Sequence, residues 1–189
     1  FHRLISVPMV QSKSPASFTN TWEGMEMTGF VNQTILEQLK KLFLDKLGED
    51  LISLILFGSR ARDEGSVGSD VDLFLIARTL PHHPFERQLY MRNLIPLGFP
   101  SQISVYPKTA EEFERDFPAI YLDLAKDGVI IHDTNHYAFY RLQKIREIIK
   151  EAGLKRVKKS GQFLWTWEKQ PAPGWRIDWS GLNGFERRS

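Results

Sequence analysis

One stretch of the chain, residues 54–76, constrains the fold more than any other part of the sequence. It reads LILFGSRARDEGSVGSDVDLFLI: an apolar run, a Gly-Ser pair, a polar loop, and a second apolar run that begins with two aspartates. Apolar runs of about seven residues bounded by turn-forming residues are typical of strands buried on both faces of a sheet. The sequence therefore predicts two core strands, Leu51–Phe57 and Val71–Ala77, joined by a compact polar loop.

The Gly-Ser pair follows the first expected strand directly. Gly58 permits a tight turn and a close approach of the backbone to a ligand. Ser59 can cap a short helix over residues 60–63, or it can offer its hydroxyl and N–H to a bound anion. Such a pair is also a common turn in its own right. The interpretation as a phosphate site therefore depends on the aspartates that follow.

Two carboxylates stand at the start of the second expected strand. Side chains two apart on a strand share a face, with Cα atoms roughly 6–7 Å apart, so Asp70 and Asp72 are expected to point the same way. Such a pair suits a hard divalent cation such as Mg²⁺. Asp70 could instead hydrogen-bond its own backbone in the loop. A lone carboxylate at Asp72 would be costly within a buried strand unless it were paired or bound to metal.

Two arginines of the same loop leave two interpretations open. Arg60 and Arg62 stand where a guanidinium could reach bound phosphates, and both could equally be solvated charges on a short helix. A metal-chelated triphosphate beside them would suit phosphoryl or nucleotidyl transfer, which needs mainly positioning and charge neutralisation.

The flanking chain predicts an α/β layered domain, because strand and helix patterns alternate. Apolar residues at spacings of three and four indicate a helix ended by Gly48. Thr109 and Glu112 form a capping-box pattern. The remaining expected elements are helices over residues 85–96, 118–128 and 135–152, strands over 101–106 and 129–131, a basic turn at 155–159, and a Trp-rich tail that packs in a core or interface. We expect an N-terminal arm (1–29), a main domain (30–134) and a C-terminal extension (135–189).

Composition excludes several classes of protein. The chain has no cysteine, which rules out disulfides and thiolate metal sites. Its net charge of +2 gives little support for nucleic acid as a partner. No apolar run approaches the ~20 residues that cross a bilayer, and the N-terminus lacks a signal-peptide pattern. A cytoplasmic protein, with self-association left open, is the expectation.

The central motif, Gly-Ser, ten residues, then Asp-x-Asp, resembles that of the DNA polymerase β-like nucleotidyltransferase superfamily, most of all its minimal nucleotidyltransferases. The likeness implies a mixed β-sheet flanked by helices. It also implies that Gly58 and Ser59 bind the phosphates of a nucleoside triphosphate such as ATP, and that Asp70 and Asp72 bind Mg²⁺ or Mn²⁺. Arg60, Arg62 and Ser69 are assigned to the nucleotide site as well; Arg60 and Ser69, with Asp63, match the motif of the minimal group.

The pattern departs from the family at one place. The family normally has a third carboxylate on a later strand, and the matching strand here is residues 101–106. By parity the candidate positions are Gln102 and Ser104, and neither is a carboxylate. Glu111, Glu112 or Asp116 from the next helix could substitute, as could a residue from a partner chain.

Two functions from different classes follow from the resemblance. The first is an enzyme that transfers a nucleoside monophosphate to a hydroxyl acceptor, as minimal members do when they act as antitoxins on a HEPN-domain toxin. The second is a catalytically impaired subunit that binds nucleotide or a partner. Transfer to a small molecule and tailing of nucleic acid are weaker alternatives, and tailing would need a larger basic surface than a charge of +2 suggests.

Overall fold

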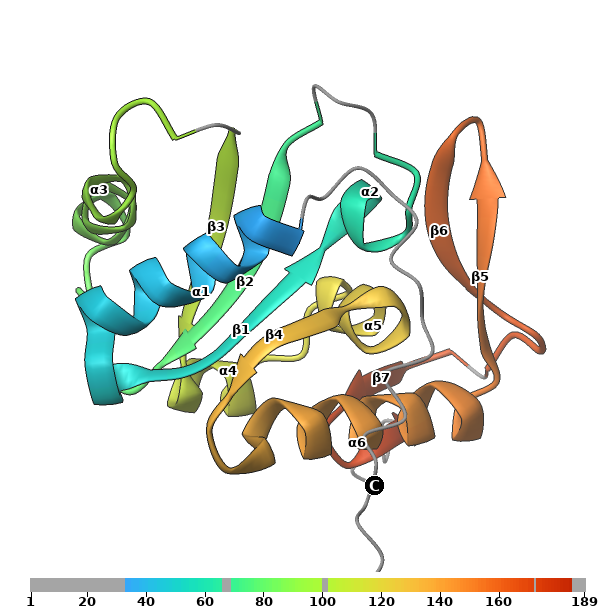
Figure 1. Cartoon of the computed structure of the whole chain (residues 1–189). Coiled ribbons are helices and arrows are strands. Elements are labelled where there is room, and N and C mark those ends of the chain that lie inside the picture. Colours follow the sequence, from blue (N-terminus) through green and yellow to red (C-terminus); the bar gives the residue numbers. More distant parts are fainter. Residues whose placement is uncertain (1–32, 66–68, 100–101, 172, 185–189) are drawn as a thin grey trace, which may run out of the picture.

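The centre of the protein is a four-stranded mixed sheet with the order β3-β2-β1-β4 (Figure 1). In a computed structural model, which describes residues 33–65, 69–99, 102–171 and 173–184, β1 pairs antiparallel with β2 and β4, and β2 pairs parallel with β3. The four strands are β1 (Leu51–Phe57), β2 (Val71–Ala77), β3 (Ile103–Thr109) and β4 (Val129–Asp133). The expected arm at residues 1–29 lies outside the described residues.

Alternation along the strands divides the core into two layers. On β2, Leu73 and Leu75 pack into one cluster, whereas Phe74 and Ile76 pack into the other. Helices α1 (Gln33–Leu47) and α3 (Pro84–Leu94) cover the first face. Helices α4 (Ala110–Arg115), α5 (Ile120–Asp127) and α6 (Tyr137–Glu151) cover the second face (Figure 1). Both central strands are thus buried on both sides, as their apolar runs predict.

The helices follow the sequence pattern with shifts at their ends. The stripe on α1 buries Leu36, Leu39, Phe43 and Leu47, and Gly48 (φ +53°) then leads into a 3₁₀ turn, η1 (Gly48–Asp50). The capping box at α4 is present, because the Thr109 hydroxyl accepts from the Glu112 N–H and the Glu112 carboxylate accepts from the Thr109 N–H. The short helix after β1, α2 (Gly58–Ala61), begins two residues earlier than expected.

The expected helix over residues 135–152 begins later than its pattern indicates. Asn135 and His136 are left-handed, with φ of 54° and 56°, and they form a 3₁₀ turn, η2 (Thr134–His136), before α6. The Asp133 carboxylate accepts hydrogen bonds from the N–H groups of Ala138 and Phe139, both at 2.9 Å. It thereby satisfies donors that the first turn of a helix leaves unpaired, so α6 starts at Tyr137.

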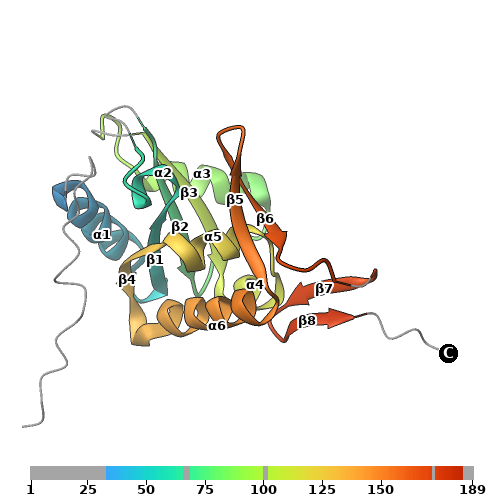
Figure 2. The same ribbon diagram turned by 90° about the vertical axis from the view of Figure 1, so that its right-hand side faces the viewer.

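Two antiparallel hairpins end the described chain. They are formed by β5 (Leu154–Lys159) with β6 (Gln162–Trp167), and by β7 (Trp175–Asp178) with β8 (Gly181–Gly184). The prediction of a solvated turn at residues 155–159 is therefore wrong: these residues form β5, because they pair with β6 across the turn at Gly161 (φ +80°). Figure 2 shows the β5–β6 hairpin rising from the end of α6.

The predicted packing role of the tryptophans is confirmed for Trp165 and Trp179, which pack against the second core cluster. The Trp179 indole N–H donates to the carbonyls of Phe113 and Asp116, and its ring lies 5.4 Å from that of Phe113. The Trp165 N–H donates to Asp123 on α5 at 3.0 Å. The hairpins are therefore attached to the second layer of the core. Within the described residues, no helix has the length and apolarity needed to cross a membrane.

Candidate active site

The pairing of β1 with β2 brings the Gly-Ser turn beside the aspartates. Phe57, the last residue of β1, stands opposite Asp72. Gly58 and Ser59 follow at once and open α2. The turn and the aspartates therefore meet at one end of the sheet, where β1 ends and β2 and β3 begin (Figure 1).

Gly58 and Asp72 touch directly. A Cβ built on Gly58 would overlap Oδ2 of Asp72 and would lie 3.1 Å from its Cγ. Gly58 also has φ of +78°, a conformation that L side chains rarely adopt. Only glycine therefore fits this turn while the carboxylate of Asp72 faces it.

The two aspartates interact electrostatically. Partial burial raises the pKa of Asp72 above its ordinary value, and the nearby charge of Asp70 raises it further. The positive charge of Arg62 acts in the opposite direction and lowers the pKa of Asp72. Asp70, Asp72 and Arg62 therefore interact through their charges at this end of the sheet.

These residues fit a divalent cation. Two carboxylates two residues apart, Asp70 just before β2 and Asp72 within it, with Asp72 partly desolvated beside the charge of Asp70, are stabilised by a hard cation that binds both. Asp70 and Asp72 would hold it, and the adjacent N–H groups of the Gly58-Ser59 turn would lie toward its anionic ligand. Within the described residues there is no cluster of three or more His, Cys, Asp or Glu side chains that could hold a metal.

Arg60 is a buried side chain of the loop. Its Nε donates to the Ser69 carbonyl at 2.7 Å, and it is 6% exposed. A Cβ on Gly65 would lie 2.8 Å from the Arg60 Cγ, so the backbone at Gly65 passes close to this arginine. Arg60 thus ties the start of the loop to Ser69, the residue before Asp70.

Arg62 contacts a second residue of the loop, one residue of α5 and one of β6. Its Nε donates to Glu64 at 2.9 Å, and its Nη1 lies 3.8 Å from Asp127 of α5. Its guanidinium carbon also lies 4.9 Å from the centre of the Phe163 ring on β6. Of the two arginines, Arg62 is the one whose charge reaches Asp72.

Of Gln102 and Ser104, the two candidate positions for a third carboxylate, Ser104 is the one opposite Asp72. Ser104 pairs with Asp72 across the parallel β2–β3 ladder. Glu111 and Glu112 do not replace it, because α4 follows Thr109, which pairs with Ala77 at the opposite end of β2. Asp116 lies beyond α4 and is paired with Lys108.

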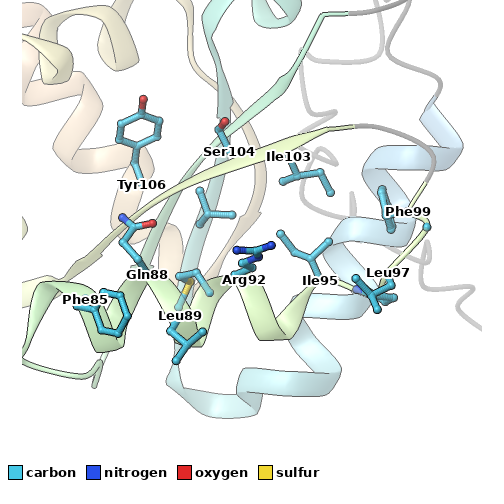
Figure 3. Close-up of a pocket in the computed structure, with 14 residues that line it drawn as sticks. Phe85, Gln88, Leu89, Arg92, Ile95, Leu97, Phe99, Ile103, Ser104 and Tyr106 are labelled. Atoms are coloured by element: carbon cyan, nitrogen blue, oxygen red, sulfur yellow. The ribbon is translucent and has the colours of Figure 1, made fainter.

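A groove of about 860 Å³ borders this position between α3 and β3 (Figure 3). Ser104 and Tyr106 border it from the strand, with their side chains on the side of β3 away from α3, and Gln88 and Arg92 extend from the helix toward the strand. Tyr106 also contacts Phe57 edge to face, with ring centres 5.4 Å apart. The third-ligand position is therefore at the border of an open groove and not inside the packed core.

Sequence reasoning missed one group of residues at the site. Asp127, Lys158 and Phe163 all contact residues of the loop between α2 and β2. They come from α5, β5 and β6, far along the chain, and neither spacing nor the central motif indicates them. The basic, aromatic alternation of residues 155–165 was the available signal.

A family model described as a nucleotidyltransferase domain matches residues 34–159. The chain belongs to the nucleotidyltransferase domain family. A relative from Methanocaldococcus jannaschii, named "Putative protein adenylyltransferase MJ1305", is 32% identical over 120 residues, which is 61% of this chain and 82% of the relative.

Solved structures resemble the family fold more distantly. A toxin–antitoxin structure with AMP-PNP has 16% identity and a TM-score of 0.46, covering 61% of this chain and 87% of that chain. A complex of a tri-AMPylated Shewanella oneidensis HEPN toxin with MNT antitoxin has 16% identity and a TM-score of 0.44, covering 63% and 87%. Membership of the family rests on the sequence matches.

Proposed function

We propose that this chain transfers AMP from ATP to a hydroxyl group of a partner protein. The proposal is carried by one observation: the Gly58-Ser59 turn and the carboxylates of Asp70 and Asp72 meet at the end of β1 and β2. Membership of the nucleotidyltransferase family supports the reaction class. The name of the M. jannaschii relative supports a protein as the acceptor.

Each residue of the site has a role in this proposal. The backbone N–H groups after Gly58 and the Ser59 hydroxyl bind phosphate oxygens at the N-terminus of α2. Asp70 and Asp72 hold Mg²⁺ or Mn²⁺, which neutralises developing charge on the phosphates when it is bound. Arg62 faces the same space and adds a charge-assisted donor. Arg60 and Ser69 act by holding the loop that carries Asp70.

The transfer itself requires little covalent chemistry from the chain. The acceptor oxygen attacks the α-phosphorus and forms the new P–O bond, while the bond to the leaving pyrophosphate breaks and the hydroxyl proton is lost to solvent or base. The Gly58-Ser59 turn, the two aspartates and Arg62 orient the triphosphate and offset its charge, which is the main requirement of such reactions.

The partner that we propose is a HEPN-domain toxin, as the resemblance to minimal nucleotidyltransferases implies. The test is to incubate the full chain with such a protein encoded beside it, ATP labelled at the α-phosphate, and Mg²⁺. Label on the partner with the wild type, but not with Asp72→Asn, supports the proposal. Asp45→Asn, on an exposed part of α1, is the matched control and should label normally.

A second function is favoured by Ser104. Ser104 occupies the position paired with Asp72, so that position contributes no carboxylate that would help activate an acceptor hydroxyl. A subunit that binds metal-nucleotide without transferring it would show Mg²⁺-dependent ATP binding in calorimetry and no label on any partner. That combination would replace the enzymatic proposal.

A further inference from the structure

The β5–β6 hairpin lies against the loop between α2 and β2, although the second strand of the hairpin lies outside the residues that match the family model. The match ends at residue 159, whereas β6 spans Gln162–Trp167. Figures 1 and 2 show the hairpin rising toward the end of the sheet where α2 lies. The contacts between the hairpin and the loop are made by a small set of charged side chains around one aromatic ring.

Phe163 is the centre of this set. The guanidinium carbons of Arg62 and Arg156 lie 4.9 and 4.3 Å from its ring centre, and the Lys158 Nζ lies 5.0 Å away. Cations at these distances are attracted by the negative face of an aromatic ring. Arg156 and Lys158 belong to the hairpin itself. Of the three cations, Arg62 is the one that belongs to the loop between α2 and β2, so its contact with the ring joins this loop to the hairpin.

Asp127 provides the second contact with Arg62. Both terminal nitrogens of Arg156, whose side chain is 6% exposed, donate to the two oxygens of Asp127. The Arg62 Nη1 lies 3.8 Å from the same carboxylate, which is 14% exposed. A bidentate arginine–carboxylate pair is geometrically specific, so Asp127 is a fixed negative charge next to Arg62.

Glu64 provides the third contact. Its carboxylate accepts from the Arg62 Nε at 2.9 Å and from the Lys158 Nζ at 3.2 Å. The hairpin therefore holds the loop at two points, Arg62 and Glu64. The Arg62 Nε makes the short bond to Glu64, whereas its Nη1 makes only the 3.8 Å contact to Asp127, so the guanidinium is restrained in position while its terminal nitrogens point away from that short bond.

We propose that the β5–β6 hairpin positions Arg62 for the triphosphate of the nucleotide, with Phe163 as the positioning residue. The inference rests on the proposed function, because it assumes that ATP binds beside Gly58 and Asp72. A free arginine loses considerable side-chain entropy when it is ordered on a ligand. The ring and the two carboxylates order Arg62 in advance, so that less of that cost remains to be met when phosphates bind.

The test compares three variants of the full chain by calorimetry with ATP and Mg²⁺, and by competition with adenosine, which has no phosphates. Phe163→Leu keeps an apolar side chain but removes the aromatic face, and Phe163→Tyr keeps the face. Leu164→Ala, at the neighbouring exposed position of β6, is the matched control. Phe163→Leu should weaken ATP binding about threefold to tenfold without changing adenosine binding, whereas the other two variants should bind both like the wild type.

A double-mutant cycle assigns the effect to Arg62. If Phe163 acts through Arg62, then Phe163→Leu should cause little further loss of ATP affinity in an Arg62→Ala background. Equal loss in both backgrounds, equal loss of ATP and adenosine affinity, or an unchanged ATP affinity in Phe163→Leu would each overturn the inference and leave the proposed function standing. A wild-type chain that binds no ATP would overturn both.

Discussion

The Cα of Gly58 lies against the carboxylate of Asp72, with no room for a side chain between them. This contact joins the phosphate turn to the metal-binding strand, because β1 and β2 are adjacent in the sheet. The site is therefore built by the pairing of two strands and not by the central loop alone.

The contact predicts the effect of Gly58→Ala. The added methyl would displace the Asp72 carboxylate and would also strain a backbone with φ of +78°. Binding of ATP with Mg²⁺ should weaken at least tenfold in calorimetry, and the free energy of unfolding should fall by roughly 1–3 kcal/mol. Gly98→Ala is the matched control, because Gly98 has φ of +82° and nothing within 4 Å of an added Cβ. It should lose about 1 kcal/mol of stability from strain alone, with ATP binding unchanged.

Asp72→Asn should stabilise the chain in the absence of metal. Burial and Asp70 raise the pKa of Asp72 above 3.8 in the folded state, so folding favours the protonated form. The associated stability is present below the unfolded pKa and is lost as pH rises through the folded pKa. Denaturant unfolding should show no difference between wild type and variant near pH 3.5, and a more stable variant at pH 7.

Adding metal should make the wild type more stable than Asp72→Asn, the reverse of their order without metal. Mg²⁺ or Mn²⁺ binds the folded wild type and stabilises it by mass action, whereas Asp72→Asn has lost one of the two carboxylates. Adding the metal with ATP should raise the melting temperature of the wild type by several degrees and leave that of the variant almost unchanged. A variant that is less stable than the wild type at pH 7 without metal would contradict this account of Asp72.

Ser104→Asp tests the missing carboxylate. Ser104 pairs with Asp72, so an aspartate there places a third carboxylate beside the other two. Affinity for Mn²⁺, followed by calorimetry, should increase about tenfold, while the free energy of unfolding without metal should decrease because like charges gather. Ser104→Asn, which adds similar volume without charge, should neither increase the affinity for Mn²⁺ nor decrease the free energy of unfolding. Equal Mn²⁺ affinity in Ser104→Asp and Ser104→Asn would show that this position does not adjoin the metal.

Glu112 links α3 to α4 away from the site. Its carboxylate accepts hydrogen bonds from both terminal nitrogens of Arg87, at 2.7 and 2.9 Å. It also accepts from the Thr109 N–H and so caps α4. The hydrogen bonds from Arg87 lower the pKa of Glu112, so its contribution to stability is present above the unfolded pKa near 4.5 and is lost as pH falls through the folded value. Glu112→Gln should cost about 1–3 kcal/mol at pH 7. The exposed neighbour Glu111→Gln should cost less than 0.5 kcal/mol in the same denaturant experiment, as surface substitutions do.

The sequence predicted the parts of this fold that local patterns determine. The strands β1 and β2 were placed at their observed bounds, because an apolar run flanked by turn residues specifies a buried strand. Parity alone narrowed the third-ligand position to Gln102 and Ser104, and the register of β2 with β3 places Ser104 opposite Asp72. The capping box at Thr109 was likewise readable from two residues three apart.

Elements that depend on distant partners were not predictable in the same way. The basic run over residues 155–159 has the pattern of a solvated turn, and only its pairing with β6 makes it a strand. The contact of Phe163 with Arg62 joins residues a hundred positions apart in the chain, and no spacing rule connects them. The late start of α6 depends on the Asp133 carboxylate and two left-handed residues, which helical periodicity does not record.

The central claim is that the Gly58-Ser59 turn and the Asp70–Asp72 pair together bind a metal-bearing triphosphate. The most direct measurement is calorimetric titration of the full chain with ATP, with Mg²⁺ and with EDTA, for the wild type and for the Asp70→Asn, Asp72→Asn double variant. We predict that the wild type binds ATP only with Mg²⁺ and that the double variant does not bind it under either condition. Equal ATP affinity in EDTA, or in the double variant, would contradict the claim.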